Sequence, residues 1–269
     1  MNTTKPIELA ELMSFSKDRY LKNIIIQLAG NHPDLEAEIT ELLRNSHIDK
    51  ANDHINQLLE NANLPCYPEH ETLENFNESC LTEEDRLIFE SIQKPEYLKS
   101  CNPNIIIYGP PGFGREHVAS GLGDLFCKRQ HKVFYINFDN LIIGLQTRTS
   151  NKSIDDFYKR MLTYNCLIIN DFAGIYLYDA DLITRLTLLI QARYAQHQKS
   201  FFTNKKNPSR PMHPFATVVT SSYPPAKWTE HFKTDPMEVL KLTNILYGCG
   251  KMLIVDESNS LEADSQSTS

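Results

Sequence analysis

The chain has 269 residues, of which 41% are hydrophobic and 23% are charged, and its formal net charge is −7. This composition is typical of a globular protein with one large or two small domains, and it excludes a membrane span because no apolar run is long enough. The beginning, MNTTKPIELAEL, lacks the apolar core of a secretion signal, so a cytoplasmic location is expected.

The charge is unevenly distributed along the chain. Residues 1–100 hold 9 Lys and Arg against 19 Asp and Glu, a net charge of −10, whereas residues 101–269 hold 18 against 15, a net charge of +3. Affinity for nucleic acid is built from Lys and Arg side chains. Any DNA contact is therefore expected from the second part of the chain.

Amphipathic stretches fill the first region, residues 1–62. Apolar residues recur at helical spacing through 7–29, 35–43 and 51–59, which predicts three short helices. Their apolar faces either pack on one another in a small helical region or dock on a partner protein.

Residues 63–100 are predicted to form a linker followed by a short helix. The segment 63–80 contains two prolines and few periodic apolar residues, so an extended linker is expected there. Thr82 and Asp85 fit a capping box, which predicts a helix that begins at this point and stops before Pro95.

From residue 101 to residue 256 the pattern changes to alternating strands and helices. Short apolar runs predict buried strands, with a helix through Lys128 after the first; the runs are 105–108, 133–136, 167–169, 216–219 and 252–255. This alternation predicts an α/β fold, a parallel sheet flanked by helices. The polar tail, 257–269, is expected to be disordered.

The turn after the first strand has the glycine frame of a phosphate-binding loop, G-x-x-x-x-G-K-[ST]. Its residues are Gly109, Pro110, Pro111, Gly112, Phe113, Gly114, Arg115 and Glu116. Backbone N–H groups at the start of the following helix would bind a phosphate without help from side chains. The alternative is a tight strand-to-helix turn that binds no ligand.

Two residues depart from this loop pattern. Arg115 replaces the lysine, and the longer planar guanidinium is no simple substitute for an ammonium group. Glu116 replaces the hydroxyl residue that binds Mg²⁺. Its carboxylate either repels the nucleotide or holds Mg²⁺ directly, and the sequence leaves both open.

A second motif follows the third strand, where CLIIND spans residues 166–171. Two acids usually end such a strand: the first orients Mg²⁺ and the second polarises the attacking water. Here Asn170 takes the first position and Asp171 the second, which makes Asp171 the candidate catalytic residue and both residues, with Glu116, candidate metal ligands. In the alternative register Asp171 holds the metal and Phe172 takes the position of the base.

Residues 199–215 are expected to form a long connection between a helix and the fourth strand. The segment contains no acid, and it combines Phe201 and Phe202 with the basic residues Lys199, Lys205, Lys206 and Arg210. Basic residues interleaved with aromatic ones suit a nucleic-acid groove, although a solvated hairpin has the same composition. We treat the four basic residues as candidate DNA contacts.

These motifs together resemble the IstB/DnaC-like family of AAA+ ATPases over nearly the whole chain. The resemblance is carried by the linker 64–77, NIIIYGPPGFG (104–114), LIINDFAG (167–174), LLIQARYAQ (188–196) and TVVTSSYPPAKW (217–228). It implies an AAA+ core that binds ATP with Mg²⁺, forms homo-oligomers and contacts DNA. The nucleotide is then expected at 109–116, with His117 and Ser222 beside it.

The sequence departs from the family pattern mainly where the γ-phosphate and metal would lie. The departures are Arg115, Glu116, Asn170, Ser222 in place of the sensing Asn, Thr243-Asn244-Ile245 in place of Asp-Arg-Leu, and 257–260 without its arginine. Because phosphoryl transfer depends on charges placed around that phosphate, hydrolysis is expected to be very weak or absent. Binding of ATP without turnover stays open.

Three functions remain compatible with the sequence. The first is an ATP-binding helper of DNA transposition, with a transposase as partner. The second is a loader of the replicative helicase, in which the N-terminal helices dock on the helicase. The third is a scaffold that kept the fold and lost its ligand.

Overall fold

The computed structural model describes residues 36–148, 150–232, 235–248 and 250–256. Two compact units divide between Gln57 and Leu58. The four regions predicted from the sequence have other boundaries and stay a prediction. In the described part of the chain no helix is both long and apolar enough to cross a membrane.

Five parallel strands form the sheet of the second unit, in the order β2-β3-β4-β1-β5. Their bounds are β1 (Ile105–Tyr108), β2 (Val133–Asn137), β3 (Cys166–Asn170), β4 (Ala216–Ser221) and β5 (Lys251–Ile254). Ile106 of β1 lies opposite Val219 of β4 and Met252 of β5. The predicted parallel sheet is confirmed, and every predicted strand is present within one or two residues.

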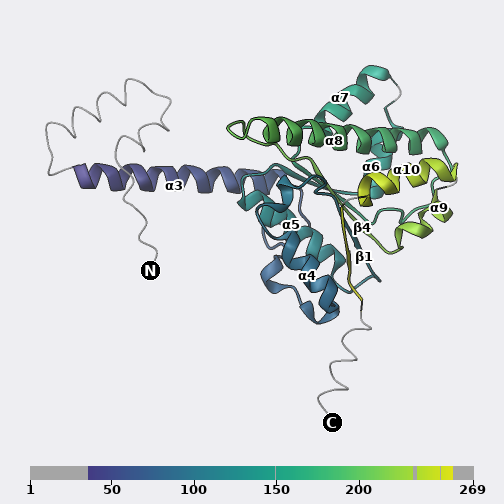
Figure 1. The fold of residues 1–269 in the computed structure, drawn as a ribbon, viewed down its shortest axis with the longest axis horizontal. Helices are drawn as coiled ribbons and strands as arrows, with labels where there is room; N and C mark the ends of the chain where they lie inside the picture. Colours follow the sequence, from purple (N-terminus) through teal and green to yellow (C-terminus); the bar gives the residue numbers. More distant parts are fainter. Residues whose placement is uncertain (1–35, 149, 233–234, 249, 257–269) are drawn as a thin grey trace, which may run out of the picture. The chain divides into compact units, whose positions relative to one another are not determined.

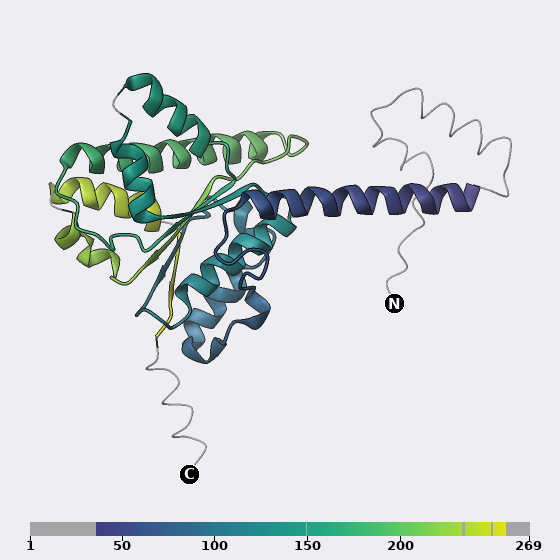
Figure 2. The ribbon, with the colours of Figure 1, turned by 180° about the vertical axis from the view of Figure 1, so that it is seen from behind.

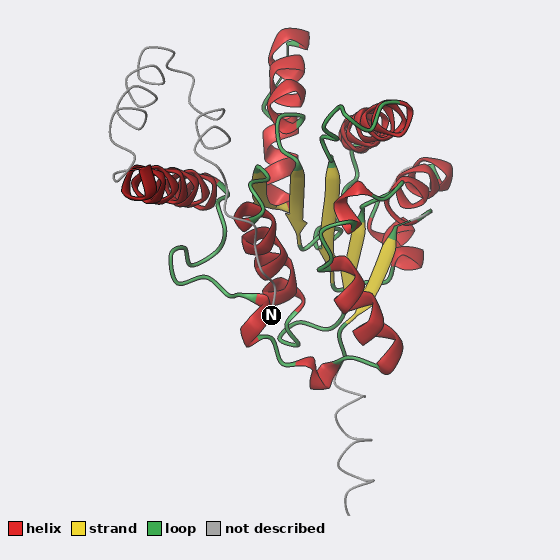
Figure 3. Ribbon diagram, turned by 60° about the vertical axis from the view of Figure 1, so that its left-hand side comes forward, coloured by secondary structure: helices red, strands yellow, loops and turns green. Residues whose placement is uncertain are grey.

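Helices cover both faces of this sheet (Figures 1 and 3). Helices α4 and α5 contact one face, and α6, α8 and α10 contact the other; α8 and α10 lie side by side in both ribbon views (Figures 1 and 2). The bounds are α4 (Glu83–Ile92), α5 (Arg115–Lys128), α6 (Phe138–Gln146), α7 (Asn151–Met161), α8 (Ala180–Lys206), α9 (Trp228–His231) and α10 (Pro236–Tyr247). The core is apolar on both sides of the strands, as a doubly covered parallel sheet requires.

The ends of two predicted helices match the structure closely. Thr82 caps α4, because its hydroxyl accepts a hydrogen bond from the backbone N–H of Asp85 at 3.0 Å. Helix α5 ends at Lys128, as predicted. The capping box also joins α4 to β5, because the Asp85 carboxylate accepts a hydrogen bond from the N–H of Ile254, the last residue of β5.

The prediction for the N-terminal region was wrong in one respect. Residues 36–43 and 51–59, predicted as parts of two helices, belong to one continuous helix, α3 (Glu36–Asn61). The intervening RNSHIDK contains neither Gly nor Pro, so nothing in it ends a helix. The helix predicted over 7–29 lies outside the described residues.

Helix α8 is longer than the sequence predicted. The expected connection 199–215 is helical as far as Lys206, and only 207–215 forms the return to β4. Pro208 is the first helix breaker in the segment, and Lys205 and Lys206 interact favourably with the negative end of the helix dipole. Three of the four candidate DNA contacts therefore lie on a helix rather than in a loop.

The expected extended linker is packed rather than free. Residues 63–80 contain two short 3₁₀ turns, η2 (Leu73–Asn75) and η3 (Glu78–Cys80), and they run along α5. Glycines on α5 make room for this segment: a Cβ at Gly121 would lie 2.7 Å from Leu73, and one at Gly123 2.7 Å from Leu64. We call residues 63–80 the strap.

Candidate nucleotide-binding site

All strands of a parallel sheet end at the same edge, and this edge collects the predicted site residues. The loop 109–114 follows β1, Asn170 ends β3 and Ser222 follows β4. Because β1 and β3 both pair with β4, the three segments lie next to one another. Sequence positions far apart are thereby brought to one place, as ligand sites in open α/β sheets require.

The loop itself has the backbone of a phosphate-binding turn. Gly112 and Gly114 have φ angles of +91° and +96°, in the left-handed region that favours glycine. At Gly109 a Cβ would lie 1.9 Å from the carbonyl oxygen of Val255, so only glycine fits there. Pro110 and Pro111 separate Gly109 from Gly112, and Phe113 separates Gly112 from Gly114, the residue before α5. The first N–H groups of α5 have no partner inside the helix and are available to an anion.

Arg115 is buried and bonded within the protein. Its side chain is 6% exposed, and its Nη1 donates to the carbonyl oxygen of Gly109 at 2.9 Å and to the hydroxyl of Ser222. Its Nη2 donates to Oδ1 of Asp171 at 3.2 Å. The guanidinium therefore joins the loop to the ends of β3 and β4, and its charge is neutralised by the second-motif carboxylate. Its Nε is buried without a hydrogen-bond partner among the described residues.

Both polar atoms of the Asn170 side-chain amide are hydrogen-bonded. Its Oδ1 accepts from the Thr220 hydroxyl at 2.6 Å, and its Nδ2 donates to Oδ1 of Asn137, at the end of β2, at 3.2 Å. Both a donor and an acceptor are used, which an amide provides and an ionised carboxylate does not. Asn170 thus ties β2, β3 and β4 together at the edge where a metal-orienting acid was expected.

Asp171 has a constrained backbone. Its φ is +54°, uncommon for a residue other than glycine, and its N–H donates to the Thr220 hydroxyl at 2.9 Å. The side chain is 44% exposed, and a Cβ on Gly174 would lie 2.3 Å from its Oδ2. Glycine at 174 therefore leaves room for the carboxylate that pairs with Arg115. Left-handed non-glycine residues cluster at functional sites, and Ala173 is a second one here, with φ +61°.

Glu116 and His117 face a cavity of about 350 Å³ beside the loop. Glu116 is exposed, and Glu71 of the strap adds a second carboxylate to the lining. His117 is turned to the strap, since its Nε2–H donates to the carbonyl oxygen of Thr72 at 2.7 Å. The Phe76 ring limits the space at Gly114, where a Cβ would lie 2.7 Å from it.

These strap residues were missed from the sequence as part of the site. The repeated glycines of the loop and α5 were the available indication, because small residues along one helix allow close approach of another segment. The strap is further fixed by His70, whose Nε2 lies 2.8 Å from Oδ1 of Asp124 on α5. The phosphate loop is therefore covered on one side by the segment that precedes the core.

The arrangement fits the phosphates of a nucleotide better than it fits a hydrolytic metal site. The backbone turn and the start of α5 supply anion-binding groups that depend on no side chain. The metal set expected from the sequence is not assembled: the amide of Asn170 is used by its neighbours, and Asp171 is paired with Arg115. Within the described ranges there is no group of three or more His, Cys, Asp or Glu side chains placed to hold a metal ion.

The predicted DNA contacts lie away from this site. Lys199, Lys205 and Lys206 occupy the last turns of α8, and Arg210 follows in the return segment. That segment leads to the amino end of β4, the opposite edge of the sheet from Ser222. All four side chains are exposed.

Sheet order, glycine loop and second motif together define a P-loop protein of the AAA+ type. Solved structures support this fold. The AMPPCP-bound replication initiator DnaA from Aquifex aeolicus superposes with a TM-score of 0.51 and 18% identity, over 74% of this chain and 54% of that one. At this level of identity the likeness concerns the fold alone.

The chain belongs to the family described as IstB-like ATP binding protein, which matches residues 19–207. The resemblance read from the motifs is thereby confirmed. An insertion sequence ATP-binding protein of Sinorhizobium fredii is 25% identical over 154 residues, 57% of this chain and 54% of that protein. A chromosomal replication initiator protein DnaA from Campylobacter jejuni is 33% identical over 79 residues, 29% of this chain and 18% of that protein. The chain therefore spans about half the length of the first relative and less of the second.

Proposed function

We propose that this protein is a nucleotide-binding AAA+ helper of DNA transposition that hydrolyses ATP very slowly or not at all. Its place would be the cytoplasm, with DNA and a transposase as partners. The family and the insertion-sequence relative support the transposition role. The observation that supports the lack of turnover is the bonding of Arg115 to Asp171 and Ser222, since all three would otherwise act on the γ-phosphate.

The backbone of residues 109–114 and the start of α5 would hold the phosphates. Glycine conformations at 112 and 114 permit close approach, and the helix dipole favours negative charge at Arg115 N–H. Arg115 would stabilise the loop from behind by its bond to the Gly109 carbonyl, rather than by contacting the phosphates. Mg²⁺, when bound with a nucleotide, supplies charge neutralisation for phosphoryl transfer. Of the three candidate ligands, Glu116 is the one that is exposed and takes no part in the hydrogen bonds around Arg115 and Asn170.

Hydrolysis needs a group that orients a water molecule next to the γ-phosphate. Asp171 is the candidate from the second motif, and its Oδ1 accepts from Arg115. The guanidinium of Arg115 therefore occupies a carboxylate oxygen that would otherwise be available to orient the water molecule. We therefore expect a bound nucleotide to persist and to act as a switch between two states of the protein.

Calorimetric titration with ATP, with and without Mg²⁺, tests the proposal together with a phosphate-release assay. We expect binding and no release of phosphate above the uncatalysed background. Release at about 1 s⁻¹ or faster, in the range of ordinary enzymes, would refute the lack of turnover. The double variant R115K/E116T, which restores the usual loop residues, is the matched comparison for both assays.

Two other functions share parts of this support. The replication-initiator relative and the DnaA fold favour a helper in DNA replication, such as a helicase loader. Co-purification with a transposase or with a replicative helicase distinguishes the two roles. The Arg115 network equally suits a scaffold without a ligand, and an absence of ATP binding at millimolar concentration, with and without Mg²⁺, would select the scaffold.

A further inference from the structure

A long part of the chain carries positive charge and no acid. Residues 182–229 contain neither Asp nor Glu, although the whole chain has 34 acidic residues. This part includes α8 from Leu182 onward, the return segment 207–215 and β4. Four of its exposed basic side chains form none of the ion pairs found in the described part of the chain: Lys199, Lys205, Lys206 and Arg210.

The folded chain adds basic residues from other segments to the same edge of the sheet. Asn165, just before β3, accepts from the N–H of Lys132 at 3.0 Å and donates to the carbonyl oxygen of Pro214 at 3.2 Å. The segment before β2 and the return segment before β4 are thereby held together. His131 and His213 therefore lie at neighbouring positions of the amino edge, opposite the nucleotide site.

The electrostatic effect of this convergence is visible on His131. Its pKa is lowered by burial first, and then by the positive groups Arg129, Lys99 and His213. Glu96 offsets part of this charge next to Arg129. Segments before β1, β2 and β4 thus contribute to one positive field.

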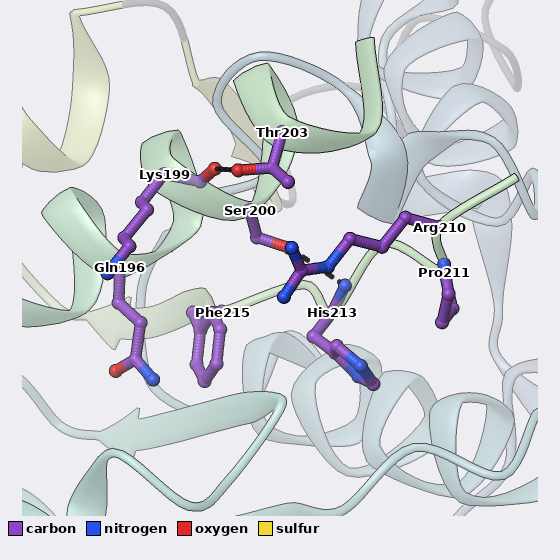
Figure 4. A pocket seen from close by; sticks show the side chains of 8 residues that line it. All are labelled: Gln196, Lys199, Ser200, Thr203, Arg210, Pro211, His213 and Phe215. Atoms are coloured by element: carbon purple, nitrogen blue, oxygen red, sulfur yellow. Dashed lines mark hydrogen bonds between the residues drawn. The ribbon is translucent and has the colours of Figure 1, made fainter. Parts of the chain in front are cut away.

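A cavity of about 280 Å³ opens in this positive surface. It is lined by Gln196, Lys199, Ser200, Thr203, Arg210, Pro211, His213 and Phe215. Figure 4 shows the Arg210 side chain extending toward Ser200 of α8, with His213 beside it. The backbone N–H of His213 donates to the Ser200 hydroxyl oxygen at 2.9 Å, which leaves the proton of that hydroxyl available to a ligand.

The walls of the cavity are held by the return segment itself. Asn204 donates to the carbonyl oxygen of Arg210 at 2.6 Å, and Arg210 N–H donates to the carbonyl oxygen of Asn207 at 3.0 Å. Phe215 N–H donates to Nδ1 of the buried His197 at 3.3 Å. Arg210 is therefore presented from a turn that is hydrogen-bonded at both ends, whereas Lys199 is presented from α8.

We propose that this cavity, which we call the α8 cavity, binds a phosphate group of the DNA backbone, with the surrounding positive surface following the strand. The inference rests on the DNA contact in the proposed function and assigns it to the amino edge of the sheet. Arg, Lys, Ser, Thr and Gln side chains are the groups that usually contact DNA phosphates. All of them line this cavity, and no carboxylate does.

An acidic protein segment is the competing occupant, because the first hundred residues of a second copy carry a net charge of −10. The cavity favours the phosphate. Lys199 and Arg210 supply positive charge to the lining, and the Ser200 hydroxyl supplies a hydrogen-bond donor, as contacts to DNA phosphates require.

The test uses the full chain and labelled 20-nucleotide DNA, both single-stranded and duplex, with binding followed by fluorescence anisotropy over a range of NaCl concentrations. The variant K199A/R210A removes two charges from the α8 cavity. The control K152A/K227A removes two exposed charges elsewhere, on α7 and in the turn before α9. The conservative variant K199R/R210K keeps the charge, and thermal unfolding checks that all variants are folded.

We expect K199A/R210A to weaken binding about tenfold or more near 0.1 M salt. The slope of log K against log [salt] should fall by about 1.4 to 1.8, because each of the two lost charge contacts releases about 0.7 to 0.9 counterions. The control should match the wild type in affinity and salt slope, and the conservative variant should keep the salt slope of the wild type. Equal binding by K199A/R210A and the control would overturn the assignment and leave the proposed function intact.

A wild type that binds no DNA would overturn both this inference and the DNA contact, while the ATP titration would still test nucleotide binding. A change in self-association by light scattering, without a change in DNA binding, would assign the surface to a second copy of the chain and also overturn the inference.

Discussion

The pair formed by Arg115 and Asp171 can be measured as a coupling free energy. The perturbations are Arg115→Met, Asp171→Asn and the double variant, and the observable is the free energy of unfolding in urea. Trp228, the single tryptophan, is fully buried in the core of the second unit and reports its unfolding by fluorescence. The cycle removes effects that each substitution has separately, such as loss of the Arg115 bond to Gly109.

The expected magnitude follows from the geometry. Two unit charges 3.2 Å apart attract by about 5 kcal/mol at an effective dielectric of 20 and by about 1 kcal/mol in water. Arg115 is 6% exposed and Asp171 is 44% exposed, so solvent screens the pair in part. We expect a coupling of about 1–3 kcal/mol, between the values for buried and surface pairs.

An exposed pair of similar length provides the control. Arg86 and Glu83 on α4 lie 3.0 Å apart, with side chains 39% and 81% exposed. The same cycle on this pair should give less than about 0.5 kcal/mol. A coupling of that size at Arg115 and Asp171 would refute the reasoning, because Arg115 would then be free to leave Asp171 and serve a phosphate.

Three further predictions concern single residues. Glu116→Gln should tighten ATP binding in the absence of Mg²⁺ by about 5- to 30-fold, because it removes the repulsion between an exposed carboxylate and the phosphates. An unchanged dissociation constant would show that Glu116 lies away from the bound phosphates. His197 is buried, and it donates to the carbonyl oxygen of Ser100 and accepts from Phe215 N–H. Burial lowers its pKa, so the unfolded chain binds more protons than the folded chain in this pH range. The free energy of unfolding should therefore fall as the pH drops from 7.5 through 6.5 toward the folded-state pKa. The Tm of His197→Gln should depend less on pH over this range than that of the wild type, and parallel curves would contradict the assignment. Arg193 is fully buried, has a pKa lowered by burial to about 10, and donates to three carbonyl oxygens. Arg193→Met should therefore lower the free energy of unfolding in urea by about 3 kcal/mol or more, because three buried acceptors lose their donor. A loss below about 1 kcal/mol would contradict this prediction.

The strands, the glycine loop and the cap of α4 could be predicted because each depends on residues close together in the sequence. A run such as Ile105–Tyr108 indicates a buried strand by itself, and Thr82 with Asp85 specifies a helix start within four residues. The family resemblance was also readable, since several short motifs occur in a fixed order along the chain.

The parts that could not be predicted depend on contacts between distant segments. The packing of the strap on α5 is one example, because Leu73 and Gly121 meet only in the folded chain. The extension of α8 is another: its last turns have mixed composition, and the helix continues because no breaker comes before Pro208. The sequence identified Arg115 as longer than the usual lysine, but it did not indicate that the guanidinium bonds to Asp171 and Ser222.

The reach of Arg115 gives the departures at this site a common physical consequence. A lysine with two acids, the usual arrangement, leaves one negative charge that a cation must balance. Here Arg115 balances Asp171, and the neutral Asn170 uses its amide to join β2 and β4. The sheet edge is therefore electrically balanced and hydrogen-bonded without a metal ion. A divalent ion placed here would have to compete with a guanidinium at 3.2 Å and with two amide bonds, whereas the backbone turn of the loop remains available to phosphate. Loss of turnover and retention of nucleotide binding are thus compatible outcomes of the same set of substitutions.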